Sequence, residues 1–129
     1  MLIELFAKEL LDTGQPDRRQ RDNKATPGNT SSLNCSQRML NAIEPGSEVP
    51  IYRHRATSET VVLLRGRAVQ YIYDNACEVV ERGLMGDGAC AMNVPMGQWH
   101  RLEALESGTV IMEFKDGAYE PIQECDVLR

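Results

Sequence analysis

Short apolar stretches recur from Gly46 onward, and each one ends in residues that favour turns. Val, Ile, Leu and Tyr fill the stretches, whereas Gly, Pro, Asp and Asn separate them. Short runs of β-branched and aromatic residues bounded in this way are typical of β-strands. The pattern predicts strands at 47–54, 59–65, 67–73, 77–84, 89–94, 99–105 and 108–115.

These strands follow one another without an intervening helical pattern. Many short strands at regular spacing favour a sandwich or a barrel. A jelly roll protects its edges by pairing two sheets. We therefore expect an all-β fold of the jelly-roll type.

The first 45 residues have a different character. Apolar residues in 2–11 repeat with helical spacing, and Gly14 and Pro16 end that pattern, so we expect a short N-terminal α-helix. Residues 15–34 are almost entirely polar and predict a surface arm or loop. A short helical turn is expected around 36–43. We expect residues 1–45 to pack on a barrel formed by 46–129, which includes a C-terminal extension, within one domain.

Size and charge narrow the function classes. The chain has 129 residues, enough for one domain, and its net charge of -5 argues against nucleic-acid binding. The basic run Arg18–Arg21 is either solvated loop or a contact for an anionic group near a pocket. Without a signal-like or membrane-length apolar segment, we expect a cytoplasmic protein that does not bind membranes. Cys35, Cys77, Cys90 and Cys125 lack metal-binding or redox spacing and are expected to be free thiols.

The candidate chemistry lies around the only two histidines of the chain. Alternation along a strand places Tyr52 and His54 on one face, and Glu59 begins the next strand after a short turn. His100 follows Pro95-Met96-Gly97, a bend that re-aims the strand behind it. His54, Glu59 and His100 are therefore expected to converge.

At these residues the chain resembles the cupin superfamily. The first cupin motif is matched in spacing by Gly46, Tyr52-Arg53-His54, Glu59 and Gly66, and the second by Pro95-Met96-Gly97 followed by His100. Tyr52 stands where that motif has its first histidine, and Ala104 stands where an asparagine is common. The resemblance implies a cupin double-stranded β-helix that binds one divalent metal ion.

Within the superfamily the chain is similar to the WbuC-type cupin fold metalloproteins. The similarity is carried by segments along nearly the whole chain, including 36–42, Glu44-Pro45-Gly46, 58–62, 97–100 and 113–121. These are small bacterial proteins often linked to O-antigen gene regions. The resemblance implies a sugar-related role without naming a reaction, and we also expect a homodimer.

The resemblance leaves three metal ligands, His54, Glu59 and His100. Two imidazoles and a carboxylate suit Fe(II), and Zn, Mn or Ni are also compatible with them. Tyr52 is either a fourth ligand or a hydrogen-bond partner of a metal-bound water. Loss of one histidine is also how a cupin becomes a metal-free binding protein.

Two hypotheses follow for function. In the first, the chain is a metal-dependent enzyme on a small polar metabolite, such as a sugar or nucleotide-sugar, and Tyr52, Gln98 and Glu113 orient the substrate or exchange protons with it. In the second, it is a non-catalytic protein that binds a carbohydrate or small acid. Glu113 qualifies for the catalytic role only if its side chain faces inward, because its strand is otherwise apolar. Trp99 is expected to pack beside the pocket.

Overall fold

A computed structural model of the chain describes residues 18–21, 36–117 and 120–128. The described part is built almost entirely from strands, with one short 3-10 helix, η2 (Glu124–Asp126). The strands are β1 (Arg18–Arg21), β2 (Ser36–Ile43), β3 (Ile51–Tyr52), β4 (Glu59–Arg65), β5 (Ala68–Tyr73), β6 (Val79–Met85), β7 (Ala91–Val94), β8 (Trp99–Ala104), β9 (Thr109–Asp116) and β10 (Val127–Leu128).

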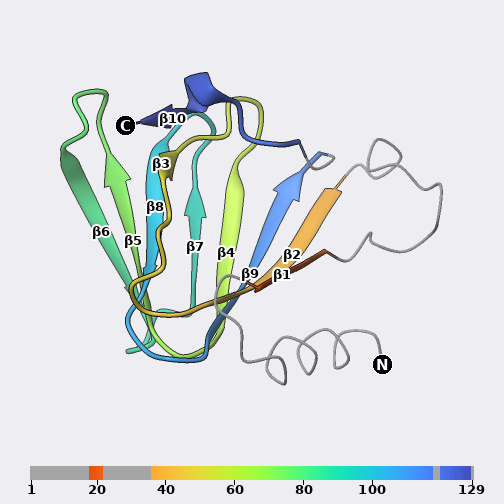
Figure 1. Cartoon of the computed structure of the whole chain (residues 1–129), viewed down its shortest axis with the longest axis vertical. Helices are drawn as coiled ribbons and strands as arrows, with labels where there is room; N and C mark the ends of the chain where they lie inside the picture. Colours follow the sequence, from red (N-terminus) through yellow and green to blue (C-terminus); the bar gives the residue numbers. More distant parts are fainter. Residues whose placement is uncertain (1–17, 22–35, 118–119, 129) are drawn as a thin grey trace.

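The strands form two five-stranded antiparallel sheets. One has the order β1-β2-β9-β4-β7 and the other β10-β3-β8-β5-β6. Figure 1 shows the two sheets side by side, with the C-terminal segment crossing above them. Sequence neighbours such as β4 and β5 lie in different sheets, as expected for a jelly roll. The predicted all-β jelly-roll fold is confirmed.

The space between the sheets is apolar at one end and polar at the other. Along β4 the inward residues run from Leu63 through Val61 to Glu59. Along β8 they run from Ala104 through Leu102 to His100. The apolar core comprises Ile43, Val61, Ala68, Met85, Leu102, Ala104 and Ile111. Glu59 and His100 therefore lie in the layer directly above the core, at the same end of the sandwich.

Residues 36–43 form a strand, and the predicted helical turn there is wrong. β2 pairs along its whole length with β9, from Ser36 opposite Asp116 to Ile43 opposite Thr109. Met39 and Ile43 face the core side, and Leu40 packs on the opposite face against Val110. Both faces are buried, so the apolar residues do not alternate, and the pairing with β9 overrides the local pattern.

The basic run Arg18–Arg21 is also a strand and not a loop. β1 adds to the edge of the first sheet by pairing with β2, with Arg18 opposite Ala42 and Arg21 opposite Met39. The predicted N-terminal helix at 2–11 lies outside the described residues. No helix in 18–21, 36–117 or 120–128 is long and apolar enough to cross a membrane.

Gly66 fixes the turn between β4 and β5, and with it the register of both strands. Its φ is +84°, a backbone conformation that residues other than glycine rarely adopt. A Cβ at this position would lie 2.8 Å from the Cα of Thr109 on β9. The last glycine of the first cupin-like motif is therefore required by both conformation and space.

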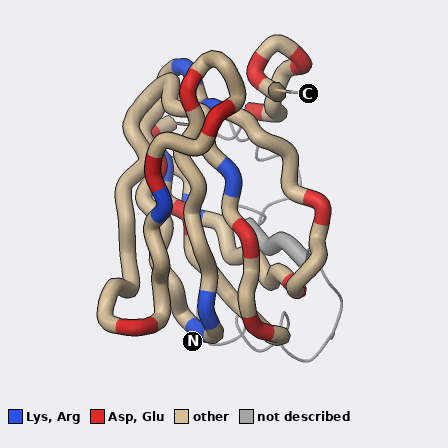
Figure 2. The backbone as a smooth tube through the Cα atoms, turned by 90° about the vertical axis from the view of Figure 1, so that its left-hand side faces the viewer, with Lys and Arg blue, Asp and Glu red and all other residues tan. Residues whose placement is uncertain are grey.

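Charged residues of both signs are spread over the described backbone. In the view of Figure 2, acidic and basic segments are interspersed along the strands and turns.

Candidate metal centre

Three elements bring the candidate ligands together. Glu59 is the first residue of β4, His100 is the second residue of β8, and His54 lies in the segment that joins β3 to β4. The amide of Gly97 donates a hydrogen bond to the carbonyl of His54 at 2.7 Å, which ties the bend before β8 to the first histidine. This backbone bond explains why the two sequence motifs meet despite their separation.

One nitrogen or oxygen atom from each of His54, Glu59 and His100 lies within 4.8 Å of the other two. His54 Nε2 is 2.9 Å from Glu59 Oε2, and His100 Nε2 is 3.9 Å from Glu59 Oε1. Metal–ligand bonds of about 2.1 Å place neighbouring ligand atoms about 3.0 to 3.4 Å apart in octahedral or tetrahedral geometry. The cluster is therefore close to the size that a divalent ion requires. Among the residues described, these three form a metal-compatible group.

His100 provides the most specific sign of a metal ligand. Its Nδ1 lies 2.9 Å from the carbonyl oxygen of Gln98, which can only accept, so Nδ1 carries the proton. Nε2 then presents a lone pair, and this buried atom has no hydrogen-bond partner among the residues that the structure describes. A histidine whose one nitrogen is anchored to a carbonyl and whose other nitrogen is free is the usual arrangement at a metal. The residues present fit a bound divalent ion.

The pKa directions support a neutral imidazole beside a charged carboxylate. Burial lowers the pKa of His100, and the attraction of Glu59 only partly opposes this effect. Burial alone would raise the pKa of Glu59, but the hydrogen bond from His54 and the neighbouring positive charges, including Lys115, lower it overall. An ionised Glu59 and a neutral His100, with its proton on Nδ1, are the forms that bind metal.

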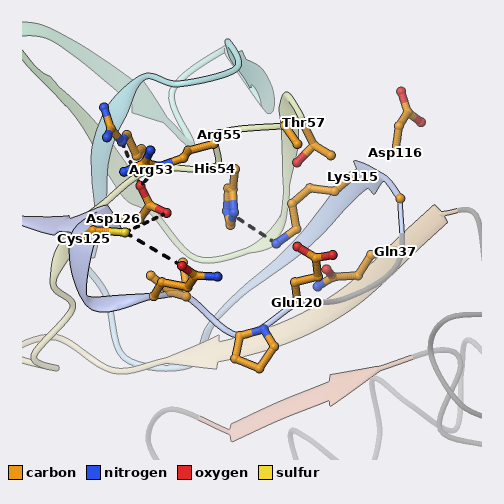
Figure 3. Close-up of a pocket in the computed structure, with 15 residues that line it drawn as sticks. Gln37, Arg53, His54, Arg55, Thr57, Lys115, Asp116, Glu120, Cys125 and Asp126 are labelled. Carbon is orange, nitrogen blue, oxygen red and sulfur yellow. Dashed lines mark hydrogen bonds and ion pairs between the residues drawn. The ribbon is translucent and has the colours of Figure 1, made fainter.

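His54 is the one candidate ligand that also lines a cavity. The cavity has a volume of about 460 Å³ and lies between the strand ends and the segment after β9. Figure 3 shows His54 and Lys115 pointing toward each other at this cavity, whereas Asp116 points away. The cavity wall also includes Gln37, Arg53, Arg55 and Asp126. A small polar molecule in this space would reach the metal centre from the His54 side.

The residues on both sides of His54 are held by one carboxylate. Arg53 and Arg55 each place Nε near Oδ1 of Asp126, at 3.0 and 2.5 Å. The guanidinium of Arg53 also lies 4.3 Å from the ring centre of Trp99. Asp126 thereby fixes the backbone that carries His54, and its pKa is lowered, first of all by the hydrogen bond from Arg55.

Tyr52 lies next to both histidines. It is opposite His100 in the β3–β8 pairing, and its ring centre is 4.4 Å from that of His100 and 5.3 Å from that of His54. The structure thus brings together all four residues predicted at the metal site, and Tyr52 is close enough to contact the ring of His100.

Gln98 and Glu113 are placed differently. The side-chain amide of Gln98 donates a hydrogen bond to the backbone carbonyl of Tyr73 at 2.8 Å, so its nitrogen is engaged with backbone. The backbone carbonyl of Gln98 orients His100. Glu113 faces the interior and is only 6% exposed, one inward position along β9 from Lys115. Its inward orientation meets the condition set for an acid or base. Trp99 packs beside the site, and its Nε1 donates to Asn75.

The sequence reasoning missed Lys115, whose Nζ lies 3.4 Å from His54 Nε2 and 3.8 Å from Glu59 Oε2. Alternation along β9 places Lys115 on the same inward face as Glu113, so the signal was available once Glu113 had been noted. Asp126 was also missed. Its contacts with Arg53 and Arg55 span more than 70 positions, which no local pattern reveals.

Similar folds occur among solved structures. Oxalate decarboxylase from Bacillus subtilis, in a structure concerned with its Mn(II) centres, matches with a TM-score of 0.56 and 20% identity over 73% of this chain and 24% of its own. The capsular polysaccharide assembling protein CapF from Staphylococcus aureus matches with a TM-score of 0.59 and 17% identity over 67% of this chain and 24% of its own. The chain thus spans about a quarter of each neighbour. At these identities the likeness shows a shared cupin fold.

At the level of sequence, a comparison with curated proteins finds no match. A family model described as a domain of unknown function, DUF6016, matches residues 4–85, which is more than half of the chain. With the fold and the cluster of His54, Glu59 and His100 in view, the chain belongs to the DUF6016 family and has a cupin fold with a metal-compatible site.

Proposed function

We propose that this chain is a WbuC-type metalloprotein that binds one divalent ion through His54, Glu59 and His100 and acts on a small polar metabolite. The observation that carries the proposal is the buried Nε2 of His100, which lies 3.9 Å from Glu59 Oε1 and has no hydrogen-bond partner within the described part of the chain. An unpaired buried acceptor is costly unless the native protein supplies a partner for it. A metal ion shared with Glu59 and His54 would be that partner.

The cavity supports a polar substrate. Its wall combines basic, acidic and amide side chains, which are suited to hydroxyl and carboxylate groups. A divalent ion bound by three protein atoms keeps open positions and would supply Lewis-acid polarisation of a substrate oxygen. The ring of Tyr52 lies 4.4 Å from that of His100, which supports a role as hydrogen-bond donor beside the ion, and the burial of Glu113 supports a role as acid or base. We assign a sugar or nucleotide-sugar as substrate class, in line with the WbuC resemblance and with CapF sharing the fold.

Metal content tests the proposal directly. Protein purified without a polyhistidine tag should contain close to one divalent ion per chain by elemental analysis. His100→Ala should lose most of it, because removal of one of three ligands leaves two. The matched control is Thr57→Val, which changes the wall of the same cavity but removes no metal ligand and leaves the contacts of Asp126 with Arg53 and Arg55 in place. Equal, near-zero metal in all three proteins would refute the metal centre.

A second candidate function is a non-catalytic binder of sugars or small acids. The position of Lys115 favours it, because an ammonium near Glu59 and His54 compensates the buried carboxylate without any metal. Thermal denaturation with chelator present separates the two functions. A metal-free binder should be stabilised by its sugar under these conditions, whereas the metalloprotein should respond to the sugar only after a divalent ion has been added.

A further inference from the structure

Lys115 is held inside the candidate metal centre by the register of three strands. It lies opposite Glu59 of β4 on one side and Gln37 of β2 on the other, on the inward face of β9. Its side chain is only 9% exposed. A lysine is rarely buried unless its charge is paired, and here the paired group is the carboxylate of Glu59.

The ammonium uses the same atoms that a metal ion needs. Nζ of Lys115 lies 3.4 Å from Nε2 of His54 and 3.8 Å from Oε2 of Glu59, and these two atoms are 2.9 Å apart. An ion about 2.1 Å from both atoms would lie no farther than about 5 Å from Nζ, whichever side of the pair it occupied. Two cationic groups this close in a buried site repel each other strongly.

His54 is in a form that suits the metal-free state. Its Nε2 lies 2.9 Å from a carboxylate oxygen, which can only accept a hydrogen bond, so Nε2 carries a proton there. A metal would need the lone pair of that same nitrogen. Since Nε2 donates to Glu59 at 2.9 Å, it cannot also accept from the Lys115 ammonium at 3.4 Å, and the ammonium provides the positive charge of the site by pairing with Glu59.

The cavity offers the ammonium another position. Lys115 lines it together with Glu120, and Figure 3 shows the carboxylate of Glu120 on the same side of the cavity as the lysine. The side chain of Lys115 has four flexible methylene groups, so Nζ can leave Glu59 without any movement of β9.

From these contacts, and given the metal site proposed above, we infer that Lys115 is a further residue of the site and that its ammonium and a divalent metal ion exclude one another. In the metal-free protein the ammonium stabilises Glu59. An entering ion displaces it into the cavity. Displacement of the ammonium from Glu59 therefore lowers the affinity of the site for a divalent ion.

Calorimetric titration with Zn²⁺ and with Mn²⁺ tests this competition. Lys115→Met keeps an unbranched side chain that is one atom shorter and removes the charge, and it should bind each ion about 10-fold more tightly than the unchanged protein. Arg65→Met is the matched control, because it removes one positive charge from the exposed end of β4, away from Glu59, and should bind as the unchanged protein does. Equal or weaker binding by Lys115→Met would overturn the inference. Absence of binding in all three proteins would overturn the metal centre as well.

Thermal denaturation adds a readout that a purely structural role would not give. Lys115→Met should melt at a lower temperature than the unchanged protein in chelator, and the gap should close or reverse with Zn²⁺. A gap of the same size in both conditions would contradict the competition.

If Lys115→Met does not fold, NMR spectra of the unchanged protein still test the inference, because the chain has only three lysines whose side-chain signals must be assigned. The side-chain NMR signal of Lys115, assigned with Lys115→Gln, should shift when Zn²⁺ is added, and an unmoved signal would contradict displacement.

Discussion

His100 shows how a single side chain is prepared for its role by its surroundings. It is 1% exposed, its Nδ1 is anchored to a backbone carbonyl, and burial lowers its pKa. The sequence placed it correctly because the bend at Pro95-Met96-Gly97 and the spacing to His100 are local. Lys115 could not be assigned in the same way, because its role depends on Glu59 and His54, which other strands bring to it.

The lowered pKa of His100 predicts a pH dependence of stability in metal-free protein. The unfolded chain takes up a proton on this histidine near its usual value of 6.5, whereas the folded protein resists doing so. The His100 contribution to stability is therefore fully present above pH 6.5 and is lost as the pH falls toward the folded pKa. Urea denaturation in chelator should show a loss of stability from pH 7 to pH 5.5 that is smaller in His100→Gln. Identical losses in both proteins would contradict this role of burial.

At the level of secondary-structure elements, the strands show which local sequence signals are sufficient to predict where a strand begins and ends. The strands from β4 to β9 were predicted to within two residues, since each is bounded by residues that favour turns, and this holds even for β6 and β7 at the sheet edges. β2 was not, because its buried residues do not alternate and its identity as a strand depends on pairing with β9. β10 has only two residues, too few to carry a periodic pattern.

Two glycines of the first motif should differ in their tolerance of substitution. Gly66 and Gly46 both have a positive φ, of +84° and +83°, but a Cβ at Gly46 meets no atom within 4 Å, whereas one at Gly66 meets the backbone of Thr109. Gly46→Ala should cost about 1 kcal/mol of unfolding free energy from backbone strain alone. Gly66→Ala should cost about 3 kcal/mol, because β9 must also shift. Chemical denaturation measures both values, and equal costs would show that the close approach to Thr109 is relaxed without penalty.

For the whole molecule, the fold and the three-residue metal group could be predicted because motif spacing encodes them. The cavity could not, since its wall combines residues 37, 53–57, 115–117, 120–123, 125 and 126, and only the closed sandwich brings these segments together. Exposed apolar residues also remain on the edge strand β6, namely Val79, Val80 and Leu84. Within the described ranges no further strand pairs with this edge, and such an edge is suited to pairing with a second copy.

We therefore expect a homodimer in solution. Light scattering should give a mass close to twice the 14.5 kDa of the chain. Val80→Asp introduces a charge at the exposed apolar edge of β6 and should shift the protein toward the monomer, whereas Leu64→Asp is a control at an equally exposed apolar residue on β4. A mass near 14.5 kDa for the unchanged protein would contradict the dimer.

The hydrogen bonds from Arg53 and Arg55 to Asp126 have a consequence for the order in which the site forms during folding. His54, which lies between those arginines, reaches its final orientation only when Asp126, 73 and 71 positions after Arg53 and Arg55, has formed these contacts. Contacts so distant along the chain form late in folding. During synthesis, the nascent polypeptide would therefore pass through its first hundred residues without a finished binding centre, and capture of an ion would mark the completion of the fold.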